Sequence, residues 1–252
     1  MAKRLIRGRR WVWLGALLFV ALVIVRAPAA LIGLLLPAGA VALETPAGTL
    51  WRGSAVLALQ HAPIGVLEWR WLPAALADGE LGVALALEGD GISAKGRVFM
   101  GIGQSRLDGL QADLDEQAVQ RLLHAYDIGA NGRLHLEDLA AERTRNGYRS
   151  ATGSVRWAGG SLAYRLQGRR YEAELPPMHA SLVAEGQTLR LAAVPLRPVG
   201  GAGTAPLLRL ALRPDGWFVA GASRAFIELA GQQWQGQSAP SDVVLEVEEK
   251  LF

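Results

Sequence analysis

The feature that most constrains the fold is an alternation of bulky apolar residues with small or polar ones. It has a period of two and recurs through much of the chain after residue 40. It is clearest in residues 81–88, where the bulky positions are Leu81, Val83, Leu85 and Leu87, and glycine, alanine or glutamate lies between them. Successive side chains of a β-strand point to opposite faces of a sheet. The pattern therefore predicts half-buried antiparallel strands with one bulky and one nearly bare face.

Similar alternation occurs at 189–191, 208–213 and 243–247. Turn-forming sequences separate the alternating segments, with Gly-Asp-Gly at 89–91 and Asn-Gly at 131–132 and 146–147. Asn-Gly pairs suit type I′ hairpin turns because both central residues need a positive φ. We therefore expect a mainly β chain whose neighbouring strands are often joined by short hairpins.

One helix is expected among the strands, near residues 114–126. Val119, Leu122, Leu123 and Tyr126 recur at helical spacing, which gives the helix one apolar face. Asp113, with Glu116 three residues later, predicts a capping box at its start. A shorter helical turn is expected after Pro73, over 74–77.

The N-terminus has the pattern of a membrane anchor. Residues 1–10 hold five basic residues and no acid, and residues 11–25 are all apolar. Trp11 and Trp13 suit the membrane boundary, and Arg26 can extend its charge to the opposite interface. The pattern predicts a cytoplasmic tail over 1–10, a single transmembrane helix with a membrane-proximal segment over 11–36, and a periplasmic remainder in a bacterial inner membrane. The alternative is a signal peptide cleaved at 27–29 or 38–40.

Charge and cysteine content exclude several classes of function. Of the 26 lysines and arginines, five lie in residues 1–10, so the 23 acids outnumber the basic residues of the remaining chain. No basic surface is expected for a nucleic acid partner. Because the chain has no cysteine, disulfides and thiolate metal sites are excluded.

A calcium loop is the nearest match to a metal motif. Residues 127–138 follow the expected helix and resemble such a loop, but Gly129 replaces an oxygen ligand and Asp138 replaces the usual glutamate. A turn into a strand is the better interpretation. The four histidines show no metal-ligand spacing. They are His61, His124, His135 and His179.

Catalytic motifs are equally weak. Ser223 lies in Gly-Ala-Ser-Arg-Ala, which lacks the second glycine of a nucleophile elbow, and a β context does not suit that elbow. Ser93 near Lys95 has no further motif beside it. We predict no catalytic residues, no cofactor and no metal.

Trp51, Trp69 and Trp71 lie close together in the sequence, beside two arginines. On one strand, Trp69 and Trp71 share a face with Leu67, and the intervening residues share the other face. We expect the tryptophan face to be core. We expect the opposite face to contact a partner through Arg52, Glu68 and Arg70.

Two short segments are similar to one another, 48–53 and 153–159, and this suggests two related β lobes. The division expected is 37–150, which includes the helix, and 151–252.

Short segments, in chain order, resemble a known family. They follow the basic N-terminus and the apolar run, and they are Arg26-Ala27-Pro28-Ala29, Gly48-Thr49-Leu50-Trp51-Arg52-Gly53, Leu67-Glu68-Trp69-Arg70-Trp71-Leu72-Pro73-Ala74-Ala75-Leu76, Gly132-Arg133-Leu134-His135-Leu136 and Gly153-Ser154-Val155-Arg156-Trp157-Ala158. Together they are similar to the general secretion pathway protein N family, the N component of the type II secretion system. The resemblance is thinnest after residue 160.

The resemblance implies a non-enzymatic inner-membrane part of the machine that exports folded proteins across the outer membrane. Its implied partners are inner-membrane and periplasmic components of the assembly platform, with the secretin as a further candidate, and membrane lipid. It also implies an AsmA-like curved antiparallel sheet. The alternative is therefore a periplasmic lipid-binding or lipid-transfer protein, whose sheet shelters acyl chains on Leu81, Val83, Leu85 and Leu87. A periplasmic hydrolase is a third hypothesis, resting on Ser93 or Ser223 alone.

Overall fold

The structure is a computed structural model. It describes positions 15, 18, 19, 22, 23 and 25–32, and then 41–59, 62–124, 128–166, 169–199 and 203–250. The described residues form two compact units, divided between Trp71 and Leu72. The prediction of a mainly β chain with a large antiparallel sheet and few helices is confirmed.

Unit 1 contains a meander of three antiparallel strands, in which each strand pairs with the next along the chain. These are β1 (Val41–Gly48), β2 (Arg52–Leu59) and β3 (Ala62–Leu72). A short 3-10 helix, η1 (Ala29–Leu31), precedes them. Leu50 N–H donates to the carbonyl oxygen of Ala27 at 2.8 Å, and Pro28 forms a β-bridge with Thr49. The β1–β2 turn is therefore joined to the segment that follows the N-terminal apolar run.

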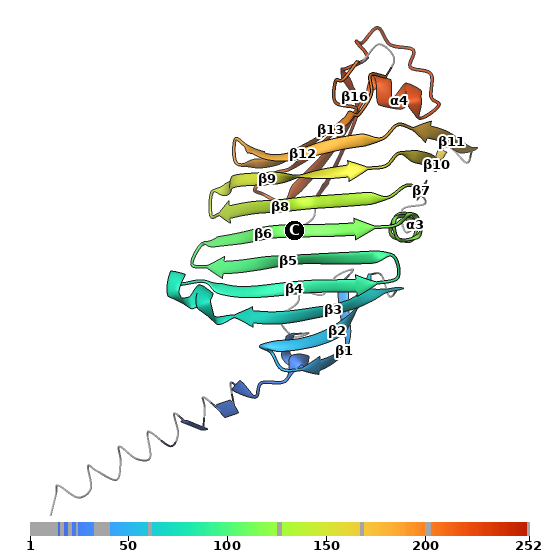
Figure 1. Cartoon of the computed structure of the whole chain (residues 1–252). Helices are drawn as coiled ribbons and strands as arrows, with labels where there is room; N and C mark the ends of the chain where they lie inside the picture. The colour runs from blue at the N-terminus through green and yellow to red at the C-terminus, as the bar shows by residue number, and fades with distance from the viewer. Residues whose placement is uncertain are drawn as a thin grey trace, which may run out of the picture. The chain divides into compact units, whose positions relative to one another are not determined.

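Unit 2 contains the main run of strands, in the order β4-β5-β6-β8-β9-β12-β13-β14-β15-β16 (Figure 1). These are β4 (Leu81–Gly89), β5 (Ile92–Gly101), β6 (Gln104–Leu114), β8 (Leu134–Thr144), β9 (Gly147–Trp157), β12 (Met178–Glu185), β13 (Thr188–Pro195), β14 (Leu208–Leu212), β15 (Trp217–Ser223) and β16 (Val243–Lys250). The strand alternation predicted at 81–88, 189–191, 208–213 and 243–247 lies on β4, β13, β14 and β16. In Figure 1, β14–β16 run at a steep inclination to β4–β9.

A smaller sheet has the order β11-β10-β7. Its strands are β7 (Ile128–Ala130), β10 (Gly160–Leu166) and β11 (Arg169–Leu175). It lies beside α3 in Figure 1. The Asn-Gly pair at 131–132 therefore does not close a hairpin, because β7 pairs with β10 and β8 pairs with β6 and β9. The pair at 146–147 does lie at a hairpin, between β8 and β9.

The described residues of unit 2 include three short helices, namely η2 (Pro73–Asp78), α3 (Glu116–His124) and α4 (Arg224–Leu229). The first two confirm the helical turn after Pro73 and the helix near 114–126. The predicted capping box is wrong, because Asp113 lies in β6 and pairs with His135. The cap is Asp115, whose Oδ1 accepts from the N–H of Ala118 at 2.8 Å.

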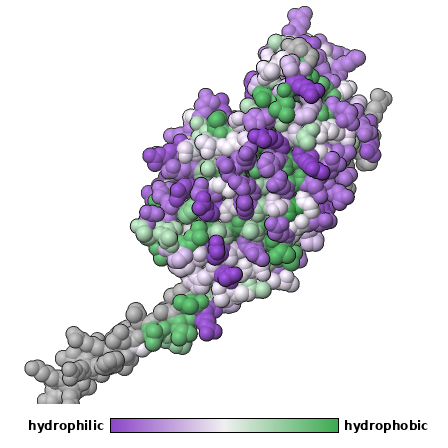
Figure 2. Space-filling model, viewed as in Figure 1, coloured by the Kyte–Doolittle hydropathy of each residue, from purple (hydrophilic) through white to green (hydrophobic). Residues whose placement is uncertain are grey.

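Strand register gives the main sheet of unit 2 one apolar face. Leu81 faces Met100, Val83 faces Val98, and farther along Leu191 faces Leu210. Charged residues occupy the opposite face, as in the pair Arg97 and Asp108. The side of the molecule drawn in Figure 2 shows mainly hydrophilic residues over β5–β9, with apolar residues between them. At the C-terminal end the apolar face is covered, and Met178, Ala180, Ala193, Leu207 and Ala225 form a buried cluster there.

Two further predictions concern the division of the chain into two similar lobes. The predicted lobe boundary at 150/151 falls inside β9, and the division into similar lobes stays a prediction. The two similar segments differ in structure, since 48–53 is a strand–turn–strand segment and 153–159 is mostly strand β9.

The predicted membrane anchor falls mainly on residues whose placement is not described, including Trp11 and Trp13. None of the helices within the described ranges has the length and apolar character needed to cross a bilayer.

Candidate functional site

The predicted contact residues lie on β2 and β3 of unit 1. Arg52 is directly opposite Arg70, and Glu68 is directly opposite Ser54. All three predicted residues are exposed. Like charges directly opposite one another on neighbouring strands repel, and no described carboxylate forms an ion pair with either guanidinium. The two arginines therefore present unpaired positive charge to the surroundings.

The opposite face of the same strands is packed, as the parity of the sequence predicted for Trp69. Trp69 is 5% exposed, and its indole N–H donates to the carbonyl oxygen of Thr49 at 3.2 Å. Gly53 lies opposite it, and the absence of a side chain there leaves room for the indole ring. Trp69 thereby fixes the β1–β2 turn against β3.

Trp71 is half-buried and contacts Trp51, with ring centroids 4.8 Å apart and planes tilted by 50°. Its indole N–H is buried and has no hydrogen-bond acceptor among the described residues. The two tryptophans of β3 thus differ in burial and in the satisfaction of the indole donor.

Of the three predicted anchor residues, only Arg26 is described. It is exposed, and its N–H donates to the carbonyl oxygen of Leu22 at 3.0 Å, a helical bond. Ala27 and Pro28, which follow the apolar run, are joined to the β1–β2 turn. Arg52 and Arg70 therefore lie on strands that are tied to the end of the apolar run.

Ser223 lies at a strand-to-helix turn, between β15 and α4, which the sequence did not predict. It is 2% exposed, and its Oγ accepts from the N–H of Phe226 at 3.2 Å. Its φ of −73° is unstrained, unlike that of a nucleophile elbow. Ser223 therefore caps α4. Ser93 Oγ donates to Glu88 at 3.0 Å and is exposed.

The histidines are not brought together into a metal site by the described residues, which contain no group of three or more potential His, Asp or Glu ligands. His135 pairs with Asp113 at 2.5 Å, and His179 lies 3.3 Å from Ser181 Oγ. His61, the His124 side chain and Asp127, the start of the calcium-like loop, lie outside the described residues.

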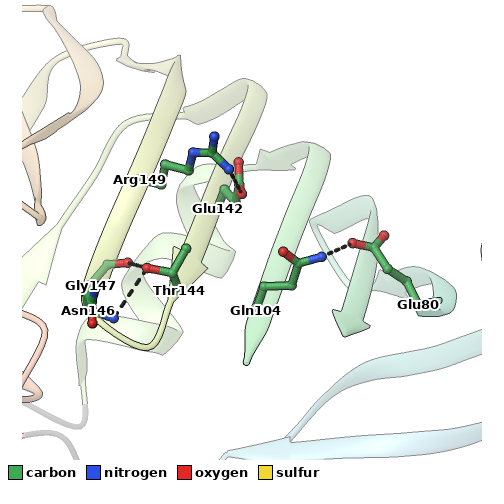
Figure 3. A network of polar contacts seen from close by, with 7 residues as sticks. All are labelled: Glu80, Gln104, Glu142, Thr144, Asn146, Gly147 and Arg149. Atoms are coloured by element: carbon green, nitrogen blue, oxygen red, sulfur yellow. Dashed lines mark hydrogen bonds and ion pairs between the residues drawn. The ribbon is translucent and has the colours of Figure 1, made fainter. Parts of the chain in front are cut away.

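A polar network at one end of the unit 2 strands was missed by the sequence analysis (Figure 3). The buried Glu80 accepts from Gln104 at 3.0 Å, the bond drawn in Figure 3. Glu80 also pairs with Arg106 at 2.9 Å. The Arg106 guanidinium also lies 4.4 Å from the centroid of the Phe99 ring. A cavity of about 370 Å³ borders Glu80, Arg106 and Glu142. Because Glu80 is buried and both of its partners bind its carboxylate, the network is best explained as a structural one.

A groove of about 700 Å³ over β12–β16 was also missed. Its lining includes Val183 and Arg190 from β12 and β13, Arg209 from β14, Val219 from β15 and Glu246 from β16. Strand register places these residues on the face of the sheet opposite Leu191 and Leu210. The sequence indicated this groove through the arginines that alternate with leucines at 189–191 and 208–213. The pairing of five strands is what brings those arginines together.

Comparison with known proteins identifies a family. The family model described as type II secretion system (T2SS), protein N matches residues 39–207, more than half of the chain. No curated protein and no solved structure matches the chain.

Proposed function

The chain belongs to the type II secretion system protein N family, and on that premise we propose that it is a non-enzymatic, single-pass component of the secretion machine in the bacterial inner membrane. Its N-terminus is cytoplasmic, and its β units are periplasmic. It contacts the assembly platform and the secretin during export of folded proteins across the outer membrane. The observation that carries this proposal is the family match, which spans strands of both units.

The basic residues of 1–10 and the apolar run of 11–25 support the topology. Alkaline phosphatase fused after Leu43 should therefore be active, because that reporter folds only after export. The mature chain should also retain its N-terminus, as measured by mass spectrometry. An inactive fusion would overturn the orientation, and an N-terminus at residue 30 or 41 would overturn the anchor.

The contact surface proposed is the outward face of β2 and β3, made of Arg52, Glu68 and Arg70. Its support is physical. The three side chains are exposed, the two arginines repel one another across the strands, and an acidic group on a partner would relieve that repulsion.

The test compares a double charge reversal on this surface with a control double reversal in unit 2. Arg52→Glu with Arg70→Glu should preserve the fold but leave cargo in the periplasm and weaken capture of platform proteins. The control is Lys95→Glu with Arg197→Glu, which makes the same change in net charge at two exposed positions of unit 2 and should secrete normally. Normal secretion by the first variant, or equal failure by both, would remove this surface from the proposal.

A second candidate function is the binding of lipid on the apolar face of unit 2. The observation that favours it is exposure, since Leu81 and Met100 face one another across β4 and β5 and are 49% and 52% exposed. Lipid identified by mass spectrometry in the purified protein, and lost in Val83→Glu with Leu85→Glu, would support lipid handling. Lipid-free protein that still captures platform components would support the secretion role alone.

A further inference from the structure

The groove over β12–β16 contains one arginine with which no carboxylate of the described residues forms an ion pair. Arg190 pairs with Glu185 at 3.0 Å, and Arg213 pairs with Glu248 at 2.8 Å. Arg209 lines the same groove, and no described carboxylate forms an ion pair with it. Glu246 lies across Gly221 from it, on the next strand but one. An unpaired guanidinium in a groove is a ready site for an oxyanion.

Arg209 has small residues directly across both neighbouring strands, and valines line other parts of a groove that also contains charged residues. Its direct neighbours across the strands are Ala192 on β13 and Gly221 on β15. Val183, Val219 and Val243 also line the groove. A volume of about 700 Å³ lies within the range of small-molecule sites, which are mostly apolar with a few polar groups that fix orientation.

These features point to a ligand with one anionic head and an apolar tail. Glu246 disfavours a head with several negative charges, because it lines the same groove. A peptide is disfavoured as well, because the groove lies on a face of the sheet. Its backbone N–H and C=O groups would lie over side chains, and the backbone groups of β12–β15 beneath them are already paired within the sheet. We propose that the groove binds a monoanionic amphiphile, with its carboxylate or phosphodiester head on Arg209 and its tail on Val183, Val219 and Val243.

The site is separate from the surfaces considered above. Arg209, Val219 and Val243 lie beyond residue 207, where the family match ends. The groove also lies on the face opposite the one that carries Leu81 and Met100 in the second candidate function. The proposal therefore does not depend on the secretion role or on lipid binding at the opposite face.

Titration calorimetry on the full chain in phosphatidylcholine nanodiscs tests it, with heats from empty discs subtracted. The probes are octanoate and octyl methyl phosphate, which carry the two possible heads. Acetate and dimethyl phosphate lack a tail, and octanol lacks the charge. We expect saturable binding of at least one charged probe with a tail, and its identity distinguishes a fatty acid from a phospholipid source. Equal binding of octanol or of a tail-less anion, or no saturable binding of either charged probe, would overturn the proposal.

Variants separate the roles of charge and shape. Arg209→Ala should weaken binding about tenfold or more, and Ala211→Leu should weaken it by filling the groove while keeping the charge. Arg156→Ala, on β9 and outside the groove, is the matched control and should bind as the wild type does. Circular dichroism checks that each variant is folded. Unchanged binding by both folded groove variants would refute the site, and Ala211→Leu decides alone if Arg209→Ala does not fold.

Discussion

Trp69 and Trp71 allow one chemical change to be made twice in the same strand, with different expected results. Tryptophan to phenylalanine removes the indole N–H and part of the ring. In Trp69 that N–H donates to Thr49 at 3.2 Å. In Trp71 it is buried without a described acceptor. Trp69 is buried and Trp71 is half-buried, so the loss of ring area is also greater at Trp69, and the fate of the donor adds to this difference in the same direction.

The magnitude follows from the cost of making or missing a hydrogen bond. Trp69→Phe loses a bond worth about 1 kcal/mol and leaves the Thr49 carbonyl oxygen unpaired. Trp71→Phe removes a donor whose burial without a partner costs about 1–3 kcal/mol, and this gain offsets the lost area. We expect Trp69→Phe to be less stable than Trp71→Phe by about 2 kcal/mol or more. Trp69→Ala, which also empties a buried site, should cost about 3–5 kcal/mol.

The assay is urea unfolding of the full chain, followed by far-ultraviolet circular dichroism so that the loss of a fluorophore does not matter. The midpoints are compared at constant m value. If Trp71→Phe were as destabilising as Trp69→Phe, the indole N–H of Trp71 would have to be satisfied in solution, and the reasoning from the buried donor would be refuted.

Three other substitutions test the polar contacts of unit 2. Arg106→Ala leaves the buried carboxylate of Glu80 with Gln104 as its one remaining described partner, and it should lower the free energy of unfolding by about 2 kcal/mol. Arg97→Ala breaks a more exposed ion pair and should lower it by about 1 kcal/mol or less. Both values are measured by the same urea assay. Asp115→Ala removes the cap of α3 and should cost about 1 kcal/mol, and an unchanged free energy of unfolding in this variant would refute the cap. Ser223→Ala should cost about 1 kcal/mol through the lost cap of α4 yet leave secretion intact, and a folded variant that fails to secrete would show a role beyond capping.

Local patterns in the sequence were sufficient for the strands and for the two faces of β3. Alternation of period two needs no knowledge of which strand pairs with which, so the strands at 81–88 and 243–247 could be predicted directly. The same parity separated Trp69 from Glu68 and Arg70. What parity could not give is the pairing itself, which makes Arg52 and Arg70 direct neighbours.

Predictions failed where a distant partner decided the local structure. Asp113 and Glu116 have capping-box spacing, but pairing with β8 keeps β6 extended as far as Leu114, so the helix starts later and Asp115 caps it. The Asn-Gly pair at 131–132 follows β7, whose partner is β10. Glu80 and Arg106, like the residues around Arg209, meet only through strand register.

The order of strands in unit 2 bears on how the chain folds. Apart from β7, β10 and β11, each strand of the main run pairs with the next one along the chain. Many of these contacts close short loops, as between β4, β5 and β6, so the entropy lost at those steps is small. A chain delivered from its N-terminal end can therefore add one hairpin at a time, and the newest strand serves as the template for the next. Until it is paired, that strand exposes backbone N–H and C=O groups that can pair with another chain. The described run ends at β16, which carries Glu246, Glu248 and Glu249 on its exposed stretch, and this density of negative charge discourages another copy from continuing the growth.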